Sequence, residues 1–360
     1  MSGTSLDGVD AVLVEFKDKQ TILIESHSHS IPNDLRVTIQ DQIHPEWKGS
    51  LADIGLLNCQ LGIVFAEAAN SLLQKSKYKK SAIKAIGNHG QTLWHQPFGK
   101  HPFSMQLGNA SIISENTGIT TVADFRSRDI AANGQGAPLV PAFHQELLSH
   151  PDKNRVILNI GGIANITILP ATNFNKDVSG YDTGPGNGLI DAWMYQHKQK
   201  RYDKNGDWGK SGQIISELLE TLLSYEYFSQ KPPKSTGKEA FNLNWLKSML
   251  GEKLTKANPK DIQATLTELT AKTIADNIND CDELFICGGG IHNRFLIDRI
   301  QHHLPDTFFA STSSVGIDPD WMEAIAFAWL AKQTIEGKTS NLPAVTGAKG
   351  RRILGAIYPA

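Results

Sequence analysis

The chain has 360 residues, of which 40% are hydrophobic and 20% are charged, and its formal net charge at pH 7 is −2. This length suits two domains of ordinary size, and the near-neutral charge argues against nucleic acid or an anionic membrane as a partner. The 3 cysteines have no zinc-ligand spacing and cannot form a disulfide framework. Since the N-terminus has no signal-peptide pattern and no apolar run approaches the ~18 residues of a membrane span, we expect a cytoplasmic protein.

The first half of the chain alternates between strand and helix patterns. Strands are predicted at residues 9–16, 21–31, 82–86, 104–107 and 121–123, and helices at about 51–76 and in a short stretch before residue 121. His27 and His29 share one face of the second strand, which admits a metal site but favours an exposed strand face. The breaker cluster at 134–138 predicts a domain boundary, with a first domain of residues 1–133 joined by 340–360, and a second of residues 134–339.

The second half begins with strands at 156–160 and 165–169, which a Gly161-Gly162 turn joins as a hairpin. A glycine-rich turn at 181–188 then leads into a helix at 189–197, and an apolar stripe at 214–223 indicates a core helix. Asp261 is the predicted N-cap of a helix through Ile274. A strand at 283–287 meets three glycines before a helix from about 293, and a last helix covers 321–335. Helices between strands favour an α/β fold.

The glycine-rich turns are the candidate nucleotide-binding elements. Residues 3–8, Gly-Thr-Ser-Leu-Asp-Gly, offer backbone N–H groups and hydroxyls to an anion such as phosphate, although an ordinary hairpin turn is the alternative. No segment has the Walker A spacing, the Rossmann fingerprint or the protein-kinase motifs. Two such turns facing each other across a cleft would hold the β- and γ-phosphates, and the glycines at 288–290 would let an adenine ring lie flat against backbone.

Eight segments follow one another along nearly the whole chain: Gly3-Thr4-Ser5-Leu6-Asp7-Gly8, Gly87-Asn88-His89-Gly90-Gln91-Thr92, Ala123-Asp124-Phe125-Arg126, Gly134-Gln135-Gly136-Ala137-Pro138-Leu139-Val140-Pro141, Asn159-Ile160-Gly161-Gly162, Asp182-Thr183-Gly184-Pro185-Gly186-Asn187, Lys234-Ser235-Thr236-Gly237 and Cys287-Gly288-Gly289-Gly290. Their turns resemble those of the actin, sugar-kinase and Hsp70 superfamily. Within it, the ordered set is similar to the anhydro-N-acetylmuramic acid kinase family. Each segment alone is weak, but the ordered set is specific.

The resemblance implies a two-lobed, actin-like ATPase (ribonuclease H-like) α/β fold, with mixed sheets flanked by helices and an interlobe cleft. It also implies a reaction of peptidoglycan recycling that uses ATP and Mg²⁺. Water opens the ring of 1,6-anhydro-N-acetylmuramic acid while O6 is phosphorylated, which gives N-acetylmuramic acid 6-phosphate and ADP. A homodimer is implied by the family likeness alone.

The acceptor oxygen O6 is locked in an ether bridge and carries no proton, so the base of this reaction must activate a water at the anomeric carbon. Asp182 is the candidate base, because it lies at a strand end before Thr-Gly-Pro-Gly-Asn and matches the family's base. The alternative is a helix cap, but Asp182 stands too far before the helix that begins near Gly188 for a simple N-cap.

The resemblance implies that the glycine turns of both halves bind ATP, with residues 288–290 and Asn293 facing the adenosine. Asp7 would contact Mg²⁺, directly or through water; its alternative is a turn carboxylate that bonds its own backbone. The expected ATP-binding residues are Gly3, Thr4, Ser5, Leu6, Asp7, Gly8, Val9, Asp10, Gly161, Gly162, Gly184, Gly288, Gly289, Gly290 and Asn293.

The expected sugar-binding residues are His89, Gln91, Thr92, Arg126 and Glu323. Arg126 suits the lactyl carboxylate or a phosphate oxygen, because guanidinium binds such groups through two parallel hydrogen bonds. Its neighbours Arg128 and Asp129 are expected to pair at the surface. Glu323 stands on an apolar helix, so we expect it to be buried and to bond a substrate hydroxyl or a structural partner.

Three other functions are open from the residues. An ordinary sugar or carboxylate kinase of the same superfamily would use Asp182 to deprotonate a substrate hydroxyl. An ATP-driven binding protein of the chaperone kind would need a peptide-binding domain, for which no residues remain. A metallohydrolase would use His89, His95 and His101, whose spacing resembles no standard zinc site. Family members carry a short apolar strand before the first turn, so we expect the true start to lie several residues upstream of Met1.

Overall fold

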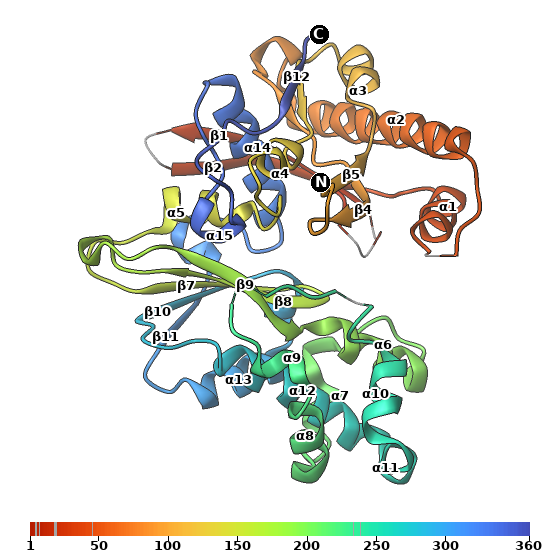
Figure 1. The fold of residues 1–360 in the computed structure, drawn as a ribbon, viewed down its shortest axis with the longest axis vertical. Helices are drawn as coiled ribbons and strands as arrows, with labels where there is room; N and C mark the ends of the chain where they lie inside the picture. Colours follow the sequence, from red (N-terminus) through yellow and green to blue (C-terminus); the bar gives the residue numbers. More distant parts are fainter. Residues whose placement is uncertain (4–5, 7, 18–19, 45, 233, 238) are drawn as a thin grey trace. The chain divides into compact units, whose positions relative to one another are not determined.

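The computed structural model describes residues 1–360 except residues 4, 5, 7, 18, 19, 45, 233 and 238 (Figure 1). The described chain forms two compact units, Met1–Leu147 with Trp321–Ala360, and Leu148–Asp320. The units are therefore divided after residues 147 and 320, whereas the sequence predicted boundaries after residues 133 and 339. The helix after residue 321 packs on strands of the first unit, and Phe143 stacks edge-to-face with Trp329 of that helix. Helices and mixed sheets occur in both units, which confirms the predicted α/β class.

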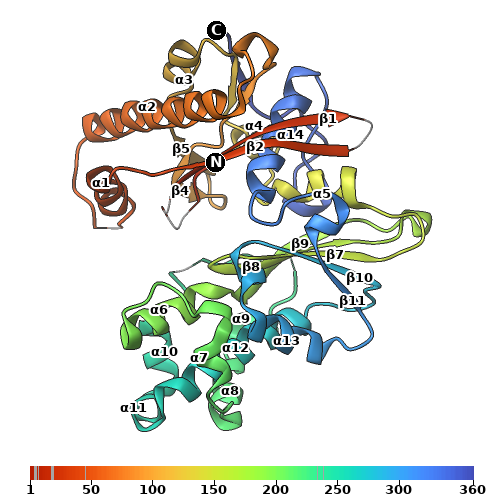
Figure 2. The ribbon, with the colours of Figure 1, turned by 180° about the vertical axis from the view of Figure 1, so that it is seen from behind.

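The second unit is built on one continuous sheet of five strands in the order β11-β10-β7-β8-β9 (Figures 1 and 2). β7 (Arg155–Ile160), β8 (Ile163–Leu169) and β9 (Ser179–Pro185) form an antiparallel meander. β10 (Glu283–Cys287) lies parallel to β7, and β11 (Phe308–Ser311) lies parallel to β10. The sheet is therefore mixed, as predicted.

Helices cover the sheet of the second unit. They are α6 (Asn187–Lys198), α7 (Asp207–Lys210), α8 (Ser216–Leu223), α9 (Glu226–Ser229), α10 (Leu243–Leu250), α11 (Glu252–Lys256), α12 (Pro259–Ala275) and α13 (Arg294–His303). α12 is the central one, since it contacts α6, α7, α8, α13 and β9 and is buried over most of its length. Its N-cap is Asn258, followed by Pro259 at the first helical position, so the prediction of Asp261 as N-cap is wrong. Asp261 instead accepts the Gln213 N–H at 2.8 Å.

The first unit distributes its strands over three small sheets. One pairs β1 (Val9–Lys17) with β2 (Gln20–His29), and one pairs β4 (Gln91–Gln96) with β5 (Phe103–Leu107), both antiparallel. The third has the order β12-β6-β3, from Ala356–Tyr358, Thr121–Ala123 and Ile86–Gly87. The strand predicted at 82–86 is therefore much shorter, and a 3-10 turn covers Lys80–Ala82.

The helices of the first unit are α1 (Asn33–Ile43), α2 (Leu51–Ser76), α3 (Ala110–Thr117), α4 (Ser127–Ala131), α5 (Val140–Leu148), α14 (Met322–Ile335) and α15 (Pro343–Thr346). α2 has the predicted ends because Ser50 and Asp53 form a capping box at its start. It packs on β1, β2 and α3. Its length and composition would let it cross a membrane, which corrects the expectation that no run is long and apolar enough. Its buried face, with Leu57, Leu61 and Phe65, belongs to the core of this unit.

An apolar cavity of about 980 Å³ lies within the first unit. Residues 9–16 of β1 line it, as do residues 82–88, which lead into and past β3, together with side chains of α2 and α14. In the described chain, the segment at 82–88 pairs with β6 at Ile86 and Gly87 and does not reach β1. The sheet formed by β1 and β2 and the sheet that contains β3 are therefore separated by space rather than joined by hydrogen bonds.

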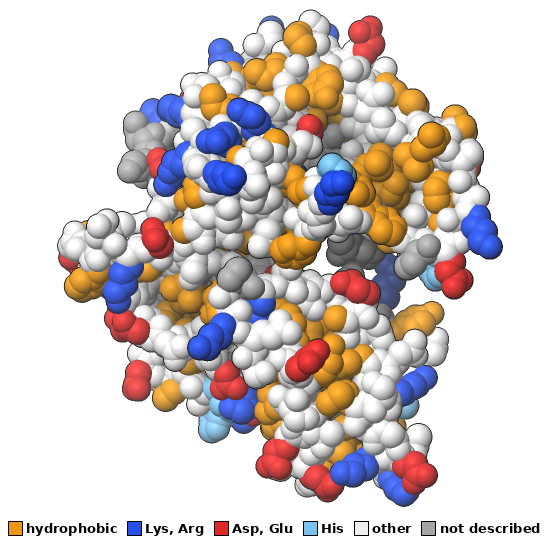
Figure 3. All heavy atoms as spheres, viewed as in Figure 1, with side chains coloured by type: hydrophobic (Ala, Val, Ile, Leu, Met, Phe, Trp, Pro, Cys, Tyr) orange, Lys and Arg blue, Asp and Glu red, His pale blue; other side chains and the backbone are white. Residues whose placement is uncertain are grey.

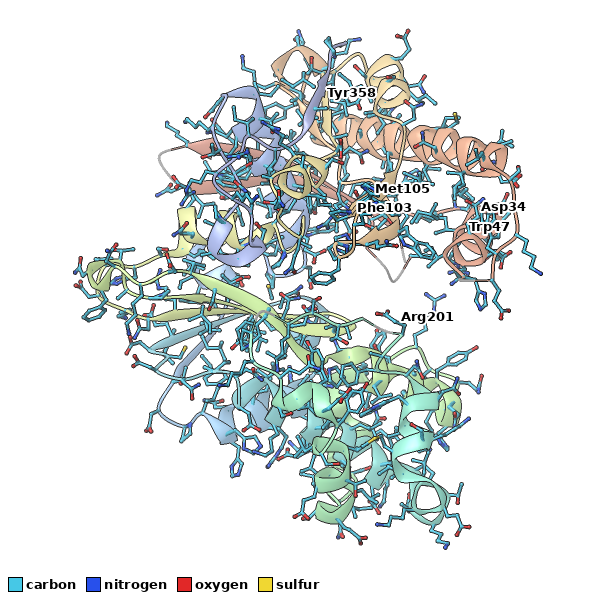
Figure 4. The ribbon with its side chains drawn as sticks, viewed as in Figure 1. Asp34, Trp47, Phe103, Met105, Arg201 and Tyr358 are labelled. Atoms are coloured by element: carbon cyan, nitrogen blue, oxygen red, sulfur yellow. The ribbon has the colours of Figure 1, made fainter. Side chains whose placement is uncertain are left out.

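The β4–β5 hairpin exposes apolar side chains. Trp94 lies opposite Met105 in the ladder, and Phe103 is the first residue of β5. All three are exposed, and hydrophobic side chains gather on this part of the first unit in Figure 3, where Figure 4 labels Phe103 and Met105.

Candidate active site

Asp182 lies on β9, opposite Asn165 of β8. Its carboxylate Oδ2 accepts the backbone N–H of Thr236 at 2.9 Å, and its carbonyl oxygen accepts the hydroxyl of Tyr227 at 2.8 Å. Burial raises the pKa of Asp182 to about 6, although the Thr236 N–H opposes that shift, and the charge of Glu239 raises it further. Since α6 begins at Asn187, with Gly186 as its N-cap residue, Asp182 does not cap it.

Polar side chains extend from Asp182 across the sheet. Asn165 is opposite Asp182, and Asn159 of β7 is opposite Asn165. Because directly opposed residues of neighbouring strands share one face of a sheet, these three side chains form a polar row on that face. Each of the three is half-buried, whereas Ile160 and Ile166, the next residues along their strands, are buried. Asn165 was not expected from the sequence, although a polar residue inside an apolar strand was the available signal.

The Gly161-Gly162 turn joins β7 to β8 as predicted and also holds the start of α6. Gly162 O accepts the N–H groups of Gly186 and Gly188 at 3.0 Å each, and Gly161 O accepts that of Asn187 at 2.8 Å. A Cβ on Gly186 would lie 2.4 Å from Gly161 O, so only glycine allows this approach. The turn is thus fixed in place, while both of its glycines stay partly exposed.

Gly184, another expected ATP residue, is buried against an aromatic side chain. Its φ is +151°, and a Cβ there would lie 2.8 Å from Cε1 of Phe228. Its position thus reflects packing of β9 against α9.

The three glycines after β10 occupy different environments. Gly288 has a φ of +79°, and a Cβ on it would lie 2.4 Å from Oδ1 of Asn159, so it lies close to the polar row. Gly290 is buried against Ile160. Gly289 is exposed and has no atom within 4 Å of the Cβ position, which leaves its face open to a ligand. Asn293 is buried and caps α13 by accepting the Leu296 N–H at 3.1 Å.

The N-terminal turn of the first unit is described only in part, because Thr4, Ser5 and Asp7 lie outside the described residues. Leu6 is buried, with a φ of +57°, and its N–H donates to Gly3 O at 3.3 Å. A Cβ on Gly8 would lie 2.9 Å from His29 O, so glycine is needed where the turn enters β1. Val9 is buried, and Asp10 follows it in β1 opposite Ser28.

Arg126 and His89 form a hydrogen-bonded pair in the first unit. Arg126 donates from one terminal nitrogen to Gly136 O at 2.7 Å and from the other to Nε2 of His89 at 2.8 Å. Since His89 accepts at Nε2, its proton is on Nδ1, which donates to Gly90 O at 2.7 Å. Burial and the neighbouring guanidinium hold the pKa of His89 well below its ordinary value, so the ring is neutral. Nε of Arg126 is buried and has no hydrogen-bond partner among the described residues.

The other expected sugar residues differ in accessibility. Gln91 is fully buried and accepts the Ser2 hydroxyl at 2.7 Å, and Thr92 Oγ1 accepts from Gln106 at 3.2 Å. Glu323 is exposed rather than buried, although Met322 and Ala324 beside it in the first turn of α14 are buried. Desolvation by the surrounding protein nevertheless raises the pKa of Glu323, while the charge of Arg126 lowers it.

Asp129 corrects a further expectation, since it is fully buried rather than paired at the surface with Arg128. Its carboxylate accepts hydrogen bonds from Asn341 at 2.7 Å, Thr346 at 2.8 Å and the Gly136 N–H at 2.8 Å. It therefore ties the turn after α4 to the C-terminal segment.

Comparisons with known proteins cover the whole chain. The family model described as anhydro-N-acetylmuramic acid kinase matches residues 1–360. The chain belongs to the anhydro-N-acetylmuramic acid kinase family. A relative of that name from Xylella fastidiosa is 48% identical over 367 residues, with 100% of this chain and 95% of the relative covered. One from Coxiella burnetii is 49% identical, covering 99% and 96%, and one from Nitrosomonas europaea is 49% identical, covering 100% and 98%.

Membership of the anhydro-N-acetylmuramic acid kinase family disfavours the other functions that the sequence left open. Across the part of the chain that the structure describes, no group of three or more His, Cys, Asp or Glu side chains could hold a metal ion. His95, one of the three histidines of the metallohydrolase alternative, instead contacts the Ser104 hydroxyl at 2.9 Å, and burial lowers its pKa to about 4.

Proposed function

We propose that this chain is an ATP-dependent kinase that opens 1,6-anhydro-N-acetylmuramic acid with water and phosphorylates O6. The products are N-acetylmuramic acid 6-phosphate and ADP, and the reaction returns a cell-wall sugar to metabolism. Family membership supports the substrate class. The observation that supports the mechanism is the position and protonation of Asp182.

The reaction needs one base beside a water. Asp182 takes a proton from that water, the resulting hydroxide oxygen bonds the anomeric carbon, and the bond from that carbon to O6 breaks. The electron pair left on O6 forms the bond to the γ-phosphorus, and ADP leaves. No proton has to be removed from O6, which distinguishes this base from that of an ordinary sugar kinase.

Asp182 has the properties that such a base needs. A pKa of about 6 leaves the carboxylate ionised at neutral pH and makes it a stronger base than an ordinary aspartate. The Thr236 N–H fixes Oδ2, and no hydrogen bond from the described residues reaches Oδ1. The base is therefore oriented, with one oxygen left to accept a proton from water.

The nucleotide would be bound by the glycine turns. The open face of Gly289 suits the adenine ring, and the partly exposed Gly161-Gly162 turn suits the phosphates. Phosphoryl transfer depends mainly on positioning and charge neutralisation. Mg²⁺ would supply part of that neutralisation; since the described residues hold no ligand cluster, phosphate oxygens, water and Asp7 are its expected ligands.

The sugar's carboxylate is assigned to Arg126. The buried Nε of this guanidinium is a donor without a partner among the described residues, and such a donor is costly unless a ligand satisfies it. His89 holds the guanidinium in place, since its neutral ring accepts one of its N–H groups.

Two forms of the sugar separate this function from that of an ordinary sugar kinase. With ATP, the enzyme should convert the anhydro sugar to the 6-phosphate and should leave the ring-opened sugar, which has a free 6-hydroxyl, unphosphorylated. Mass spectrometry of both reactions gives the answer. Faster phosphorylation of the ring-opened sugar would assign Asp182 to hydroxyl deprotonation and overturn the proposal.

A cytoplasmic location fits this function, because ATP is supplied there. A homodimer stays a prediction, and light scattering on the purified protein would test it.

A further inference from the structure

Lys234 is a buried lysine whose charge has no counterion among the residues that the structure describes. The residue is 7% exposed, and its Nζ has no hydrogen-bond partner among the described residues. Nζ lies over the face of the Tyr227 ring, 5.0 Å from the ring centroid. Desolvation lowers the pKa of this lysine, as expected for an ammonium removed from water.

Lys234 stands directly beside the proposed base. Its carbonyl oxygen accepts the Asp182 N–H at 3.3 Å, and two residues later the Thr236 N–H donates to the Asp182 carboxylate. Tyr227, which lies under the ammonium, donates its hydroxyl to the Asp182 carbonyl. Yet Nζ of Lys234 makes no hydrogen bond to Asp182 in the described structure, so the lysine is placed near the base without pairing with it.

A buried unpaired ammonium is unfavourable, since desolvation of an ion costs several kcal/mol unless a partner compensates it. The contact with Tyr227 offsets part of that cost, because a cation over an aromatic ring gains about 0.5–2 kcal/mol. An apolar side chain of similar length would suit the packing better. Lys234 therefore places a positive charge without a counterion among the described residues next to Asp182, the proposed base.

We propose that Lys234 binds an anionic oxygen of a substrate, either the carboxylate of the acidic sugar or the terminal phosphate of the nucleotide. The shared chemistry is a charge-assisted hydrogen bond from the buried ammonium. The identity of the two anions rests on the proposed function, whereas the need of Lys234 for an anion rests on its own surroundings.

The test replaces Lys234 by methionine, which keeps the apolar stem and removes the charge. Lys231→Met, an exposed lysine of the same connection, is the matched control. Calorimetry gives the Kd of four ligands for each protein: the anhydro sugar, its carboxamide, ATP and ADP. We expect either the anhydro sugar or ATP to bind about 10- to 100-fold more weakly to Lys234→Met, as for the loss of one hydrogen bond to a charged group.

The paired ligands identify the source of the anion. Weaker binding of the acid but not of its carboxamide assigns Lys234 to the sugar carboxylate. Weaker binding of ATP but not of ADP assigns it to the terminal phosphate. Values within twofold of wild type for all four ligands would overturn the proposal. These binding measurements need no turnover. If the protein did not open the anhydro ring, the proposed function would be wrong, but the Kd values would still show whether Lys234 binds an anion.

Stability distinguishes a ligand-binding lysine from a structural one. Removing an unpaired buried charge should leave the Tm of Lys234→Met equal to or above that of wild type, whereas a structural lysine would lower it. If the variant does not fold, the proposal is contradicted on that ground. The wild-type protein gives a second measurement: anion binding should take up protons at alkaline pH, because a bound anion raises the lowered pKa of Lys234.

Discussion

The two units of this chain differ in how completely their sheets are built. In the second unit, five strands form one ladder from β9 to β11, and its apolar residues pack in continuous clusters. In the first unit, β1 and β3 belong to separate sheets, and an apolar cavity of about 980 Å³ borders both. The first unit thus loses stability through unfilled space, while the second places Asp182 and the buried Lys234 on a complete scaffold.

Asp182 makes the stability of the second unit depend on pH. Burial raises the pKa of Asp182 to about 6, so this unit becomes less stable as the pH rises through the range from about 4 to 6.

The largest expected effect comes from Asp182→Asn, which removes the base and leaves the sheet intact. We expect kcat to fall by roughly 10²- to 10⁴-fold, the usual scale for a lost general base, while the Kd of ATP stays near its wild-type value. Steady-state kinetics and calorimetry measure the two quantities. Asp177→Asn, an exposed aspartate before β9, is the control and should retain full activity. Retention of most activity by Asp182→Asn would remove this residue from the mechanism.

The same variant should be more stable than wild type at neutral pH. The pKa of Asp182 rises from 3.8 to about 6 on folding, so wild type loses about 3 kcal/mol of stability as the pH increases through that range. Asparagine does not ionise, and its free energy of unfolding should not fall there. Urea unfolding between pH 4 and pH 8 measures the difference. Parallel curves for the two proteins would show that burial of Asp182 has no such effect.

Filling the cavity of the first unit should reduce the difference in packing between the two units. Met1 and Asp10 exchange both backbone hydrogen bonds, at 2.8 Å each, as an opposed antiparallel pair does. Residues added before Met1 would therefore run along β1 and enter the cavity. We expect an extension of about six β-branched apolar residues to raise Tm by roughly 5–10 °C.

The matched control for that experiment is a Gly/Ser extension of equal length, which should leave Tm unchanged. Hydrogen exchange should also slow at residues 11–16 and 84–88 with the apolar extension alone. Equal Tm values for the two extended proteins would mean that the cavity does not accept a strand.

Adjacent glycines of the second unit offer a finer test. Gly289→Ala meets no atom within 4 Å, so Tm should stay within about 1 °C, but the added methyl should weaken ATP binding roughly 10-fold if adenine lies on that face. Gly290→Ala places its Cβ 2.3 Å from Cγ2 of Ile160 and should instead lower Tm. Unchanged ATP affinity in Gly289→Ala would show that adenine does not lie on the face of Gly289.

Much of the fold could be predicted from local sequence signals. The capping box at Ser50 fixes the start of α2, and the Gly161-Gly162 pair fixes the hairpin of β7 and β8. What could not be predicted depends on distant partners. β12 is three residues long and exists because it pairs with β6, far away in the sequence. Residues 82–85 have the composition of a strand but border the cavity instead of a neighbouring strand.

The residues of the candidate site also fall into those that the sequence could predict and those whose surroundings it could not. Asp182 could be found because the residues around it form a specific motif. Lys234 stood in a quoted segment, but nothing in its sequence context shows that the side chain is buried and unpaired. Asp129 was expected at the surface because its partners, Asn341 and Thr346, come from the far end of the chain. Glu323 was expected to be buried because its helix is apolar, whereas it is exposed between the buried Met322 and Ala324.

The most direct test of the account is the origin of the oxygen at C1 of the product. The reaction is run with the anhydro sugar and ATP in H₂¹⁸O, and product formed in ordinary water is held in H₂¹⁸O for the same time to measure exchange. If Asp182 activates water to open the ring, each product molecule should carry one ¹⁸O at C1 above that background. A phosphorylated product without label at C1 would contradict the mechanism.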